Sequence, residues 1–529
     1  ERASRPMPTR RRTFIPQDED VIVQPHPLSV APLGQLLLLD ASAENLRDSL
    51  GLLSSLPDEA IVMITDCCSA VMLARCSMVS RGLRIFCSSE ELWRTRVIEE
   101  LPEGAPLCYS GTWLQTYLQR TTSRPCDGAP APMGGRLFSD ALFTSWFCGT
   151  ASIPRRWTQY ENIERVDASA LSVAEFASRF EEPGVPVILT GLASGWAASH
   201  TWSHDALLRR FGQTTFNVGA LQMRLDHFLA YSADCHDETP LYLFDKHFAA
   251  KAPELAAEYV TPAYFAPERD LFARLPSDCR PDYRWLIVGG TRSGSGWHVD
   301  PNASSAWNAV IRGSKKWILT PPGRPPPGIT ASDDGATVTA PVSLYEWYRI
   351  FYSSLEGSEL RGAPPAVRPR EAVLREGELL FVPRGWWHAA INLEPTIALT
   401  QNYVPASSAR HVLRYLDPAT ARELVSGVAP ERRPPARAPT LPLAPARRKP
   451  QPSSPSPSPS PNPNPSPNPN PNPNPKPNPN PNQKQNPNPG PSPNPNPSPD
   501  TDPNANPNPD PNPNPNPSPS PSPGPPLHG

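Results

Sequence analysis

The stretch Tyr283–Pro322 constrains the fold of this chain more than any other. Its sequence is YRWLIVGGTRSGSGWHVDPNASSAWNAVIRGSKKWILTPP, in which runs of Val, Ile, Leu and Trp flank a glycine-rich turn. Short runs of β-branched and aromatic residues, separated by glycine, are typical of successive strands in a packed sheet. This part of the chain therefore predicts neighbouring strands at the centre of the fold.

The same stretch contains His298, Val299 and Asp300 in a row. Successive side chains on a strand point to opposite faces, so we expect His298 and Asp300 to share a face while Val299 points away. An imidazole and a carboxylate side by side supply two of the three ligands of a facial Fe(II) site. A His-x-Asp pattern is short and also arises by chance, so its meaning depends on a third ligand.

A candidate for that third ligand is His388. It lies in residues 378–404, ELLFVPRGWWHAAINLEPTIALTQNYV, which read as two more strands joined by a short turn. If His388 faces inward, Ala390 and Asn392 face inward as well. From the residues alone two interpretations stay open: His388 is a hydrogen-bonded core histidine, or it is a metal ligand.

The phrases HVDPNASSAWNAVIRGSKKW and FVPRGWWHAAINLEPTIALTQNYV resemble the Jumonji-C (JmjC) family of Fe(II)- and 2-oxoglutarate-dependent oxygenases. Within it, the chain is most similar to the arginine-demethylase and lysyl-hydroxylase branch and to plant members that carry an F-box. The resemblance implies an α+β fold, a double-stranded β-helix of the cupin or jelly-roll type with buttressing helices. It also implies that His298, Asp300 and His388 bind iron.

The resemblance further implies binding of the co-substrates 2-oxoglutarate and O2. Lys315 and Thr400 match the family positions that hold the far carboxylate of 2-oxoglutarate, and Asn308 and Ser295 match further contacts. A buried carboxylate needs a cation or a hydroxyl, because an unpaired buried charge is very costly. Two inward-facing amides are expected to orient the metal ligands: Asn392 and Asn402.

Without the resemblance, Lys315 is interpreted as a surface lysine beside Lys316. Strand alternation places Lys316 on the opposite face, where we expect its replacement to have little effect. Family members often present a tyrosine hydroxyl from the helix before the barrel. His227 and Phe228 stand at that position, so we expect this hydroxyl to be absent or replaced.

The chain before the barrel contains a helical stretch over residues 40–105. Leu56–Glu59 and Leu92–Arg94 resemble the F-box, whose role is to dock a ubiquitin-ligase adaptor. The alternative is a helical cap on the catalytic domain without a partner. The predicted organisation is a disordered leader (1–39), an F-box-like helical module (40–105), a linker with helices (106–167), the JmjC oxygenase domain (168–427) and a disordered tail (428–529).

The segment between the two halves of the barrel, residues 323–370, includes an aromatic-rich helix over 342–355. Its aromatic side chains either line a substrate entrance or pack the helix down, and packing is the favoured interpretation. They are Tyr345, Trp347, Tyr348 and Phe351.

Composition excludes several classes of protein. The net charge of −2 gives no overall attraction to nucleic acid, and no apolar run approaches the ~20 residues of a membrane span. Nine cysteines without a C-x-x-C pair favour a reducing compartment over a zinc module or a disulfide framework. The tail consists largely of Pro, Asn and Ser and cannot bury a core, so it is expected to be disordered. Basic triplets at 10–12 and 447–449 are candidate nuclear import signals.

The sequence therefore predicts a nuclear, or otherwise cytoplasmic, oxygenase that acts on basic side chains of proteins such as histones. Hydroxylation of an N-methyl carbon gives a carbinolamine that loses formaldehyde, which is demethylation, whereas hydroxylation of a lysine carbon stops at the alcohol. Arginine demethylation is the favoured reaction and lysyl hydroxylation the alternative. A hypothesis of another class is an F-box substrate receptor of a cullin-RING ubiquitin ligase. Neither sequence-specific nucleic-acid binding nor a membrane partner is expected.

Overall fold

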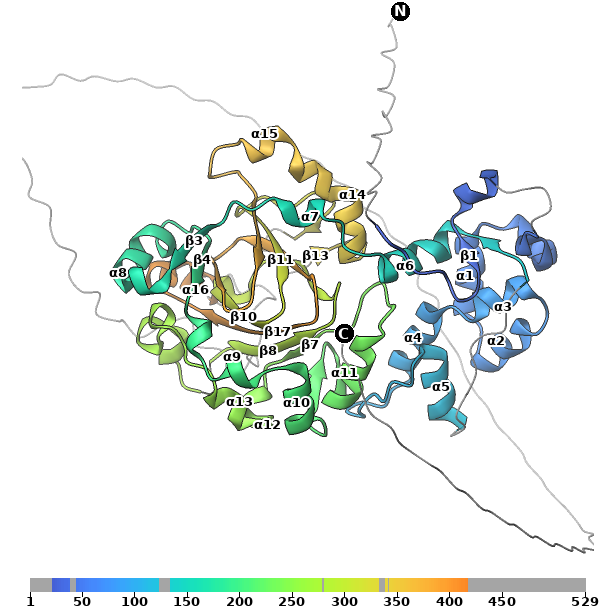
Figure 1. Ribbon diagram of the computed structural model, residues 1–529, viewed down its shortest axis with the longest axis horizontal. Coiled ribbons are helices and arrows are strands. Elements are labelled where there is room, and N and C mark those ends of the chain that lie inside the picture. The colour runs from blue at the N-terminus through green and yellow to red at the C-terminus, as the bar shows by residue number, and fades with distance from the viewer. Residues whose placement is uncertain are drawn as a thin grey trace, which may run out of the picture. The chain divides into compact units, whose positions relative to one another are not determined.

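The computed structural model describes residues 21–38, 44–122, 134–277, 280–332, 338–340 and 342–416 (Figure 1). The predicted tail and both basic triplets lie outside these residues. No helix among the described residues is long and apolar enough to cross a membrane.

Two facing sheets form the centre of the fold. The larger has the strand order β3-β4-β15-β10-β17-β8-β7-β5-β6 and the smaller β14-β11-β16-β9. The eight barrel strands are β8 (Arg284–Gly289), β9 (Gly294–His298), β10 (Ser305–Arg312), β11 (Lys315–Thr320), β14 (Arg370–Leu374), β15 (Leu379–Val382), β16 (Trp387–Asn392) and β17 (Thr396–Tyr403). They are divided equally between the two sheets and pair antiparallel within each. This is a double-stranded β-helix, so the predicted fold class is confirmed.

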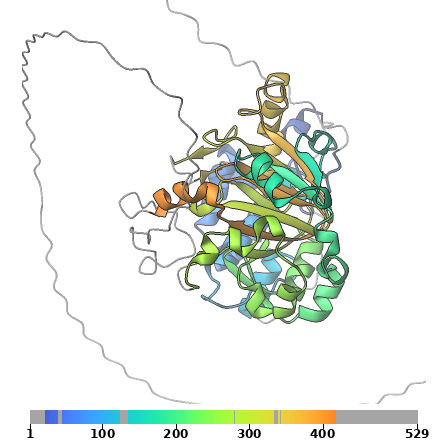
Figure 2. The same ribbon diagram turned by 90° about the vertical axis from the view of Figure 1, so that its left-hand side faces the viewer.

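Further strands extend the larger sheet, and helices cover its outer face. The strands are β3 (Glu164–Asp167), β4 (Val187–Thr190), β5 (Thr215–Val218), β6 (Leu221–Arg224) and β7 (Leu243–Asp245). The helices are α8 (Val173–Phe176), α9 (Ala198–Thr201), α10 (His204–Phe211), α11 (Leu225–Ala233), α12 (Phe248–Lys251) and α13 (Pro253–Ala257). Figures 1 and 2 show helices α9 to α13 together on one side of the barrel. The strand β6 is followed at once by α11, which begins at Leu225.

The segment between the two halves of the barrel covers the outer face of the smaller sheet. It contains β12 (Thr330–Ala331), β13 (Val338–Thr339), α14 (Leu344–Glu356) and α15 (Ser358–Arg361). Tyr345, Trp347 and Tyr348 of α14 are buried against the outer face of the smaller sheet, in a cluster with Ile318 and Ile391. The packing interpretation of these aromatic residues is therefore confirmed, and the idea that they line an entrance is wrong.

This cover changes the interpretation of Lys316. Its side chain lies on the outer face of β11, as alternation predicted, but α14 and Tyr160 bury it completely. The ammonium group donates to the Tyr160 carbonyl at 2.8 Å and lies 3.0 Å from Glu371 Oε2, which also accepts from the Tyr352 hydroxyl. Burial lowers the pKa of Lys316, and Glu371 opposes that shift. This burial with Glu371 argues against the expectation that Lys316 can be removed with little effect.

We expect Lys316→Ala to destabilise the protein by about 3 kcal/mol, because it leaves Glu371 as a buried charge with fewer partners. The exposed Lys246, replaced by alanine, is the matched control. Because a buried pair can be exchanged for apolar residues at little cost, Lys316→Met combined with Glu371→Leu is expected to restore most of the loss. Thermal unfolding of the three variants measures this, and an unchanged midpoint in Lys316→Ala would contradict it.

The N-terminal helices form a module with its own small core. They are the 3-10 helix Leu46–Ser55 and the helices α1 (Asp58–Asp66), α2 (Ala70–Ser77), α3 (Arg81–Cys87) and α4 (Glu90–Glu99). Leu46, Leu50, Ile61, Ile85 and Phe86 pack together at its centre. The helical character predicted for this part of the chain is thus observed.

The leader differs from its prediction, and the segment predicted as a linker with helices does contain helices. In the leader, β1 (Val30–Ala31) pairs in parallel with β2 (Leu137–Phe138), so residues 21–38 are not a disordered segment. The expected linker is part of the body of the protein and holds α5 (Trp113–Thr122), α6 (Asp140–Thr150) and α7 (Arg156–Gln159). The Trp113 indole donates to Asp237 Oδ1 at 2.8 Å, and the Leu107 amide donates to the Gln222 carbonyl at 2.7 Å. These contacts join the segment that follows the helical module to the barrel domain.

Candidate metal centre

His298, Asp300 and His388 come together at one end of the barrel. Their ligand atoms all lie within 4.8 Å of one another, and they are the only such group of three found among the described residues. His298 and His388 are paired neighbours on β9 and β16, with ring centroids 4.2 Å apart. Asp300 Oδ2 lies 4.0 Å from His388 Nε2. The long-range pairing that the spacing of the sequence could not establish is present in the fold.

Asp300 reaches the site by a route that alternation did not predict. The strand β9 ends at His298, and Asp300 precedes a short 3-10 turn, Pro301–Ala303. Within the turn, Asn302 and Ala303 have the positive φ angles 58° and 51°. The turn, not an extended strand, therefore directs the carboxylate toward the two imidazoles.

Hydrogen bonds orient both imidazole rings. His298 Nδ1 lies 2.7 Å from the Gly296 carbonyl, and His388 Nδ1 lies 3.0 Å from the Trp386 carbonyl. Since a carbonyl only accepts, each Nδ1 carries the proton and each Nε2 offers its lone pair. Burial lowers the pKa of His388 far below its usual value, and the charge of His298 adds to this shift.

The carboxylate of Asp300 is buried with one amide, that of Asn402, as its hydrogen-bond partner among the described residues. Asp300 Oδ2 is buried without a hydrogen bond, and burial raises the pKa of the carboxyl group even though His298 and Asn402 oppose the shift. Two neutral imidazole nitrogens and one such carboxylate are the donor set of a facial Fe(II) site. A divalent cation would supply the missing charge, so these residues fit the metal.

The predicted co-substrate residues lie deeper in the barrel. Lys315 is only 1% exposed, and burial lowers its pKa to about 7. Its ammonium group donates to the Tyr242 hydroxyl at 2.6 Å, and Tyr242 also shares a hydrogen bond with Ser295. Asn308 and Thr400 are paired neighbours on β10 and β17. The structure thus brings Lys315 and Ser295 together through a residue that the sequence did not single out.

A tyrosine hydroxyl was expected to be absent or replaced, and the structure places that of Tyr242 inside the barrel next to Lys315. Tyr242 precedes β7, whereas the sequence comparison had placed this position at His227 and Phe228 on α11, where Phe228 is buried. Gly289 makes room for it, because a Cβ atom there would lie 2.6 Å from the tyrosine ring. The sequence around Tyr242, PLYLFD, forms the strand β7 from Leu243 onward, and this position next to a strand is the signal that the sequence offered.

The amides behave differently from one another. Asn402 donates to the Ser304 hydroxyl at 2.8 Å and is bonded to Asp300, as expected for a residue that orients a ligand. Asn392 instead donates to Ser293 Oγ at 2.9 Å and to the Gly290 carbonyl at 3.3 Å. It therefore holds the turn between β8 and β9, and the expectation that it orients the metal ligands is wrong. Asn308 Oδ1 is buried without a partner and is available to a ligand.

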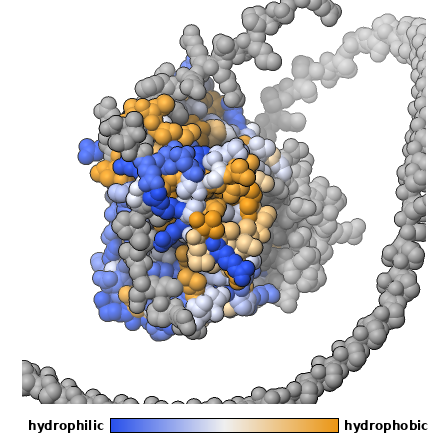
Figure 3. Space-filling view, turned by 90° about the vertical axis from the view of Figure 1, so that its right-hand side faces the viewer, coloured by the Kyte–Doolittle hydropathy of each residue, from blue (hydrophilic) through white to orange (hydrophobic). Residues whose placement is uncertain are grey.

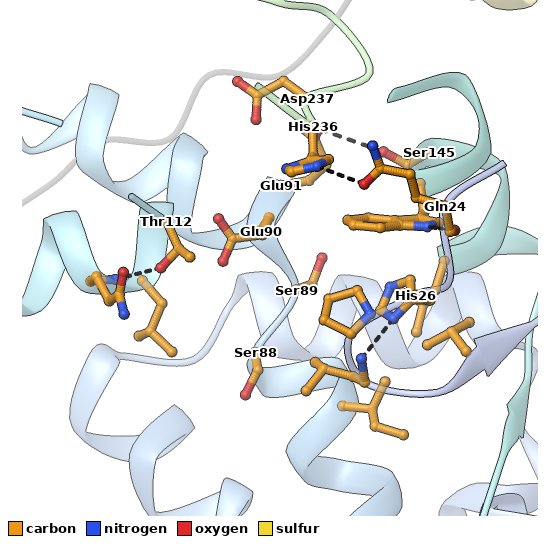
Figure 4. Close-up of a pocket in the computed structure, with 18 of the residues that line it drawn as sticks. Gln24, His26, Ser88, Ser89, Glu90, Glu91, Thr112, Ser145, His236 and Asp237 are labelled. Carbon is orange, nitrogen blue, oxygen red and sulfur yellow. Dashed lines mark hydrogen bonds between the residues drawn. The ribbon is translucent and has the colours of Figure 1, made fainter. Parts of the chain in front are cut away.

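A larger cavity of about 690 Å³ lies away from this site, between the helical module, the N-terminal segment and residues 234–237 (Figure 4). None of the predicted site residues lines it. Its carboxyl groups hold the surrounding elements: Glu90 accepts from the Trp113 amide at 2.6 Å, and Asp237 accepts from Tyr231 at 2.6 Å. Burial raises the pKa of Glu90 to about 7. These contacts indicate that the cavity is part of the interface between the helical module and the oxygenase domain.

Comparisons with known proteins agree with both modules. Residues 173–409 match the family described as a cupin-like domain, and residues 53–99 match the F-box-like family. The chain is 42% identical over 402 residues to the arginine-specific demethylase JMJ22 of Arabidopsis thaliana, covering 75% of this chain and 77% of that protein. It is 36% identical over 376 residues to the lysine-specific demethylase JMJ21 of the same plant, covering 68% and 37%. It is 36% identical over 253 residues to the bifunctional arginine demethylase and lysyl-hydroxylase psr-1 of Caenorhabditis elegans, covering 46% and 61%.

Proposed function

Because this chain belongs to the JmjC family of Fe(II)- and 2-oxoglutarate-dependent oxygenases, in a form that carries an F-box-like domain, we propose that it demethylates arginine side chains of nuclear proteins such as histones. The observation that carries the proposal is the convergence of His298, Asp300 and His388 within 4.8 Å, with a buried lysine deeper in the barrel that has no carboxylate partner among the described residues. Of the three relatives described above, two are named for arginine demethylation, and one of these is also named for lysyl hydroxylation.

The roles of the residues follow from their positions. His298 Nε2, His388 Nε2 and an oxygen of Asp300 would hold Fe(II) from one side and leave its other positions to the co-substrates. With 2-oxoglutarate and O2, iron supplies the oxidising power that hydroxylates a C–H bond. Lys315 and Tyr242 would bind the far carboxylate of 2-oxoglutarate, with Thr400 beside them on β17. Trp317, whose ring lies 5.9 Å from His388, lines the interior and helps to exclude water.

Mass spectrometry distinguishes demethylation from hydroxylation. The full chain is incubated with Fe(II), 2-oxoglutarate, O2 and a histone-tail peptide that contains dimethylarginine and lysine. We expect the arginine to lose one methyl group and formaldehyde to appear. A gain of one oxygen on lysine instead would replace demethylation by lysyl hydroxylation, the alternative reaction of the same site. Succinate formation without any change to such peptides would contradict both.

A second function is supported by the surface of the F-box-like module. Large apolar side chains are exposed on α1, on α2 and just after α2, and we call them the apolar face: Met63, Ile64, Val71, Met72, Met78 and Val79. Figure 3 shows hydrophobic residues at the surface on the side where this module lies. Exposed apolar groups gathered in one place mark a protein interaction site. We propose that the apolar face docks a ubiquitin-ligase adaptor.

We expect Val71→Glu combined with Met78→Glu to abolish adaptor binding, because two charges would have to be buried in an apolar contact. Both side chains are exposed, so the fold is expected to survive the change. Val260→Glu, at an equally exposed valine of the oxygenase domain, is the matched control. Pull-down of a purified adaptor by the full chain measures binding. If all variants recover the same amount of adaptor, the docking proposal is wrong and the module is a structural cap.

A further inference from the structure

A pocket of about 440 Å³ opens beside the metal centre. Its walls are residues 181–185, Ser305, Pro321, Pro322, Pro365, Ala366, Arg370, 383–384, Trp386, 407–408 and His411. Trp386 connects it to the metal site, because its carbonyl accepts the hydrogen bond that orients His388. Ser305 is the first residue of β10, directly after the turn that carries Asp300. The pocket and the metal centre therefore share the same end of the barrel.

The strand register places Arg370 on the same side of the smaller sheet as the metal ligands. Arg370 is paired with Leu319, Leu319 with His388, and His388 with His298, in one row across four strands. Residues directly opposite one another on paired strands point to the same face. Ala372 and Leu374, which share the face of Arg370, are packed inside the barrel. Arg370 thus lies two strands from His388, or about 10 Å at the usual spacing of strands.

The two arginines of the pocket have no carboxylate partner. Among the described residues, the Arg384 side chain makes no hydrogen bond or ion pair, and only its backbone amide donates, to Ser305 Oγ at 3.1 Å. Arg370 reaches the Asn162 carbonyl at 3.4 Å, and its Nε is buried without a partner. Burial lowers the pKa of both guanidinium groups; Arg368 adds to the shift of Arg370, which Tyr160 opposes, and no carboxylate contributes to either shift. Arginine nevertheless stays charged in proteins, so the pocket holds two partly buried positive charges.

The acids at the rim do not neutralise them. Glu181 is engaged with Arg269 at 3.1 Å and accepts from the Tyr403 hydroxyl at 3.1 Å. Glu182, which also lines the pocket, is exposed to solvent. Unpaired guanidinium groups in a polar recess match the bidentate geometry of a carboxylate or a phosphate.

We propose that this pocket binds an acidic side chain of the protein substrate, a carboxylate or a phosphate monoester, about three residues from the residue that is oxidised. The inference rests on the proposed function, because it takes the metal centre as the place of reaction. An extended chain advances about 3.3 Å per residue, so about three residues span the 10 Å between His388 and Arg370. The preferred substrate is then a basic segment with one acidic or phosphorylated residue close to the target.

Peptide binding tests the pocket without turnover. Fluorescent peptides carry a central dimethylarginine and a single Glu, moved stepwise through the flanking positions, and partner peptides carry Gln at the same place. A further pair of peptides carries phosphoserine or serine at the same place. With the full chain, Fe(II) and 2-oxoglutarate under nitrogen, we expect Glu or phosphoserine at about three residues to bind roughly tenfold tighter than its neutral partner, as for one charge-assisted hydrogen-bonded pair. Equal affinities at every position would overturn the proposal.

Variants then locate the preference. Arg384→Gln is expected to remove it, and Arg324→Gln, at an exposed arginine outside the pocket lining, is expected to keep it. Arg384→Glu should instead prefer the peptide in which Lys replaces the acidic residue, a rescue that a misfolded variant cannot show. A preference that survives Arg384→Gln, or that Arg324→Gln also removes, would overturn the assignment.

Formaldehyde release from the same peptides separates the two proposals. No release from any peptide, together with a binding preference that depends on Arg384, would reject arginine demethylation and keep the acidic-residue pocket. Formaldehyde release from all peptides, together with equal affinities for all of them, would support arginine demethylation and reject the acidic-residue pocket.

Discussion

Asp300→Ala is expected to abolish Fe(II) binding and 2-oxoglutarate turnover. Asp300 is the only carboxylate in the group of three, and its buried oxygen has no other partner, so its loss leaves two imidazoles to hold a divalent ion. Loss of a mere outer hydrogen-bond partner of a metal ligand costs roughly ten- to a hundredfold in affinity, and loss of the ligand itself should cost more than that. Calorimetric titration of Fe(II) under nitrogen and succinate release measure the two effects.

A carboxylate elsewhere on the same domain provides the control. Asp234 is exposed and does not belong to the group, so Asp234→Ala should bind iron as the unchanged protein does. His388→Ala is expected to behave like Asp300→Ala, and it tests the pairing of β9 with β16. Succinate production retained by either Asp300→Ala or His388→Ala would show that the metal lies elsewhere.

Lys315→Ala is expected to weaken 2-oxoglutarate binding by roughly a hundredfold to a few thousandfold. The far carboxylate would then be buried beside the Tyr242 and Thr400 hydroxyl groups without a cation, and breaking one side of such a pair costs about 3–5 kcal/mol. Fe(II) affinity should be retained, because Lys315 contacts no metal ligand. Titration of 2-oxoglutarate into the iron-loaded protein measures the loss.

The exposed Lys246 is a better control for this experiment than the neighbouring Lys316, whose removal should destabilise the fold. Lys246→Ala should bind 2-oxoglutarate as the unchanged protein does. Equal affinities for Lys315→Ala and Lys246→Ala would move the co-substrate carboxylate away from Lys315.

The lowered pKa of Lys315 adds a pH dependence with a definite sign. In the ligand-free protein this lysine loses its proton above a pKa of about 7, because burial disfavours the charged form. A carboxylate needs the ammonium form, so above pH 7 binding must take up a proton, and affinity should fall by about tenfold per pH unit. Tyr242 stays neutral across this range, since burial raises its pKa. Lys315→Ala should flatten the dependence, and a flat profile in the unchanged protein would contradict it.

The amino-acid sequence by itself determined the local elements and most of the candidate site. Runs of β-branched and aromatic residues mark the barrel strands, and the prediction of a double-stranded β-helix is confirmed. The predicted residues His298, Asp300 and His388 do converge, although their role on iron stays a prediction. Such features are local, because they depend on which residues follow one another and on the face to which each side chain points.

The tertiary structure alone decided what covers each face and what meets across the chain. Alternation shows that Lys315 and Lys316 point to opposite faces, but not that α14 buries the second as deeply as the barrel buries the first. Tyr242 reaches Lys315 from 73 residues away, and β1 pairs with a strand more than a hundred residues later. The row that places Arg370 beside the metal ligands likewise joins four strands. Pairings of this kind depend on packing between distant segments, for which local propensity carries no signal.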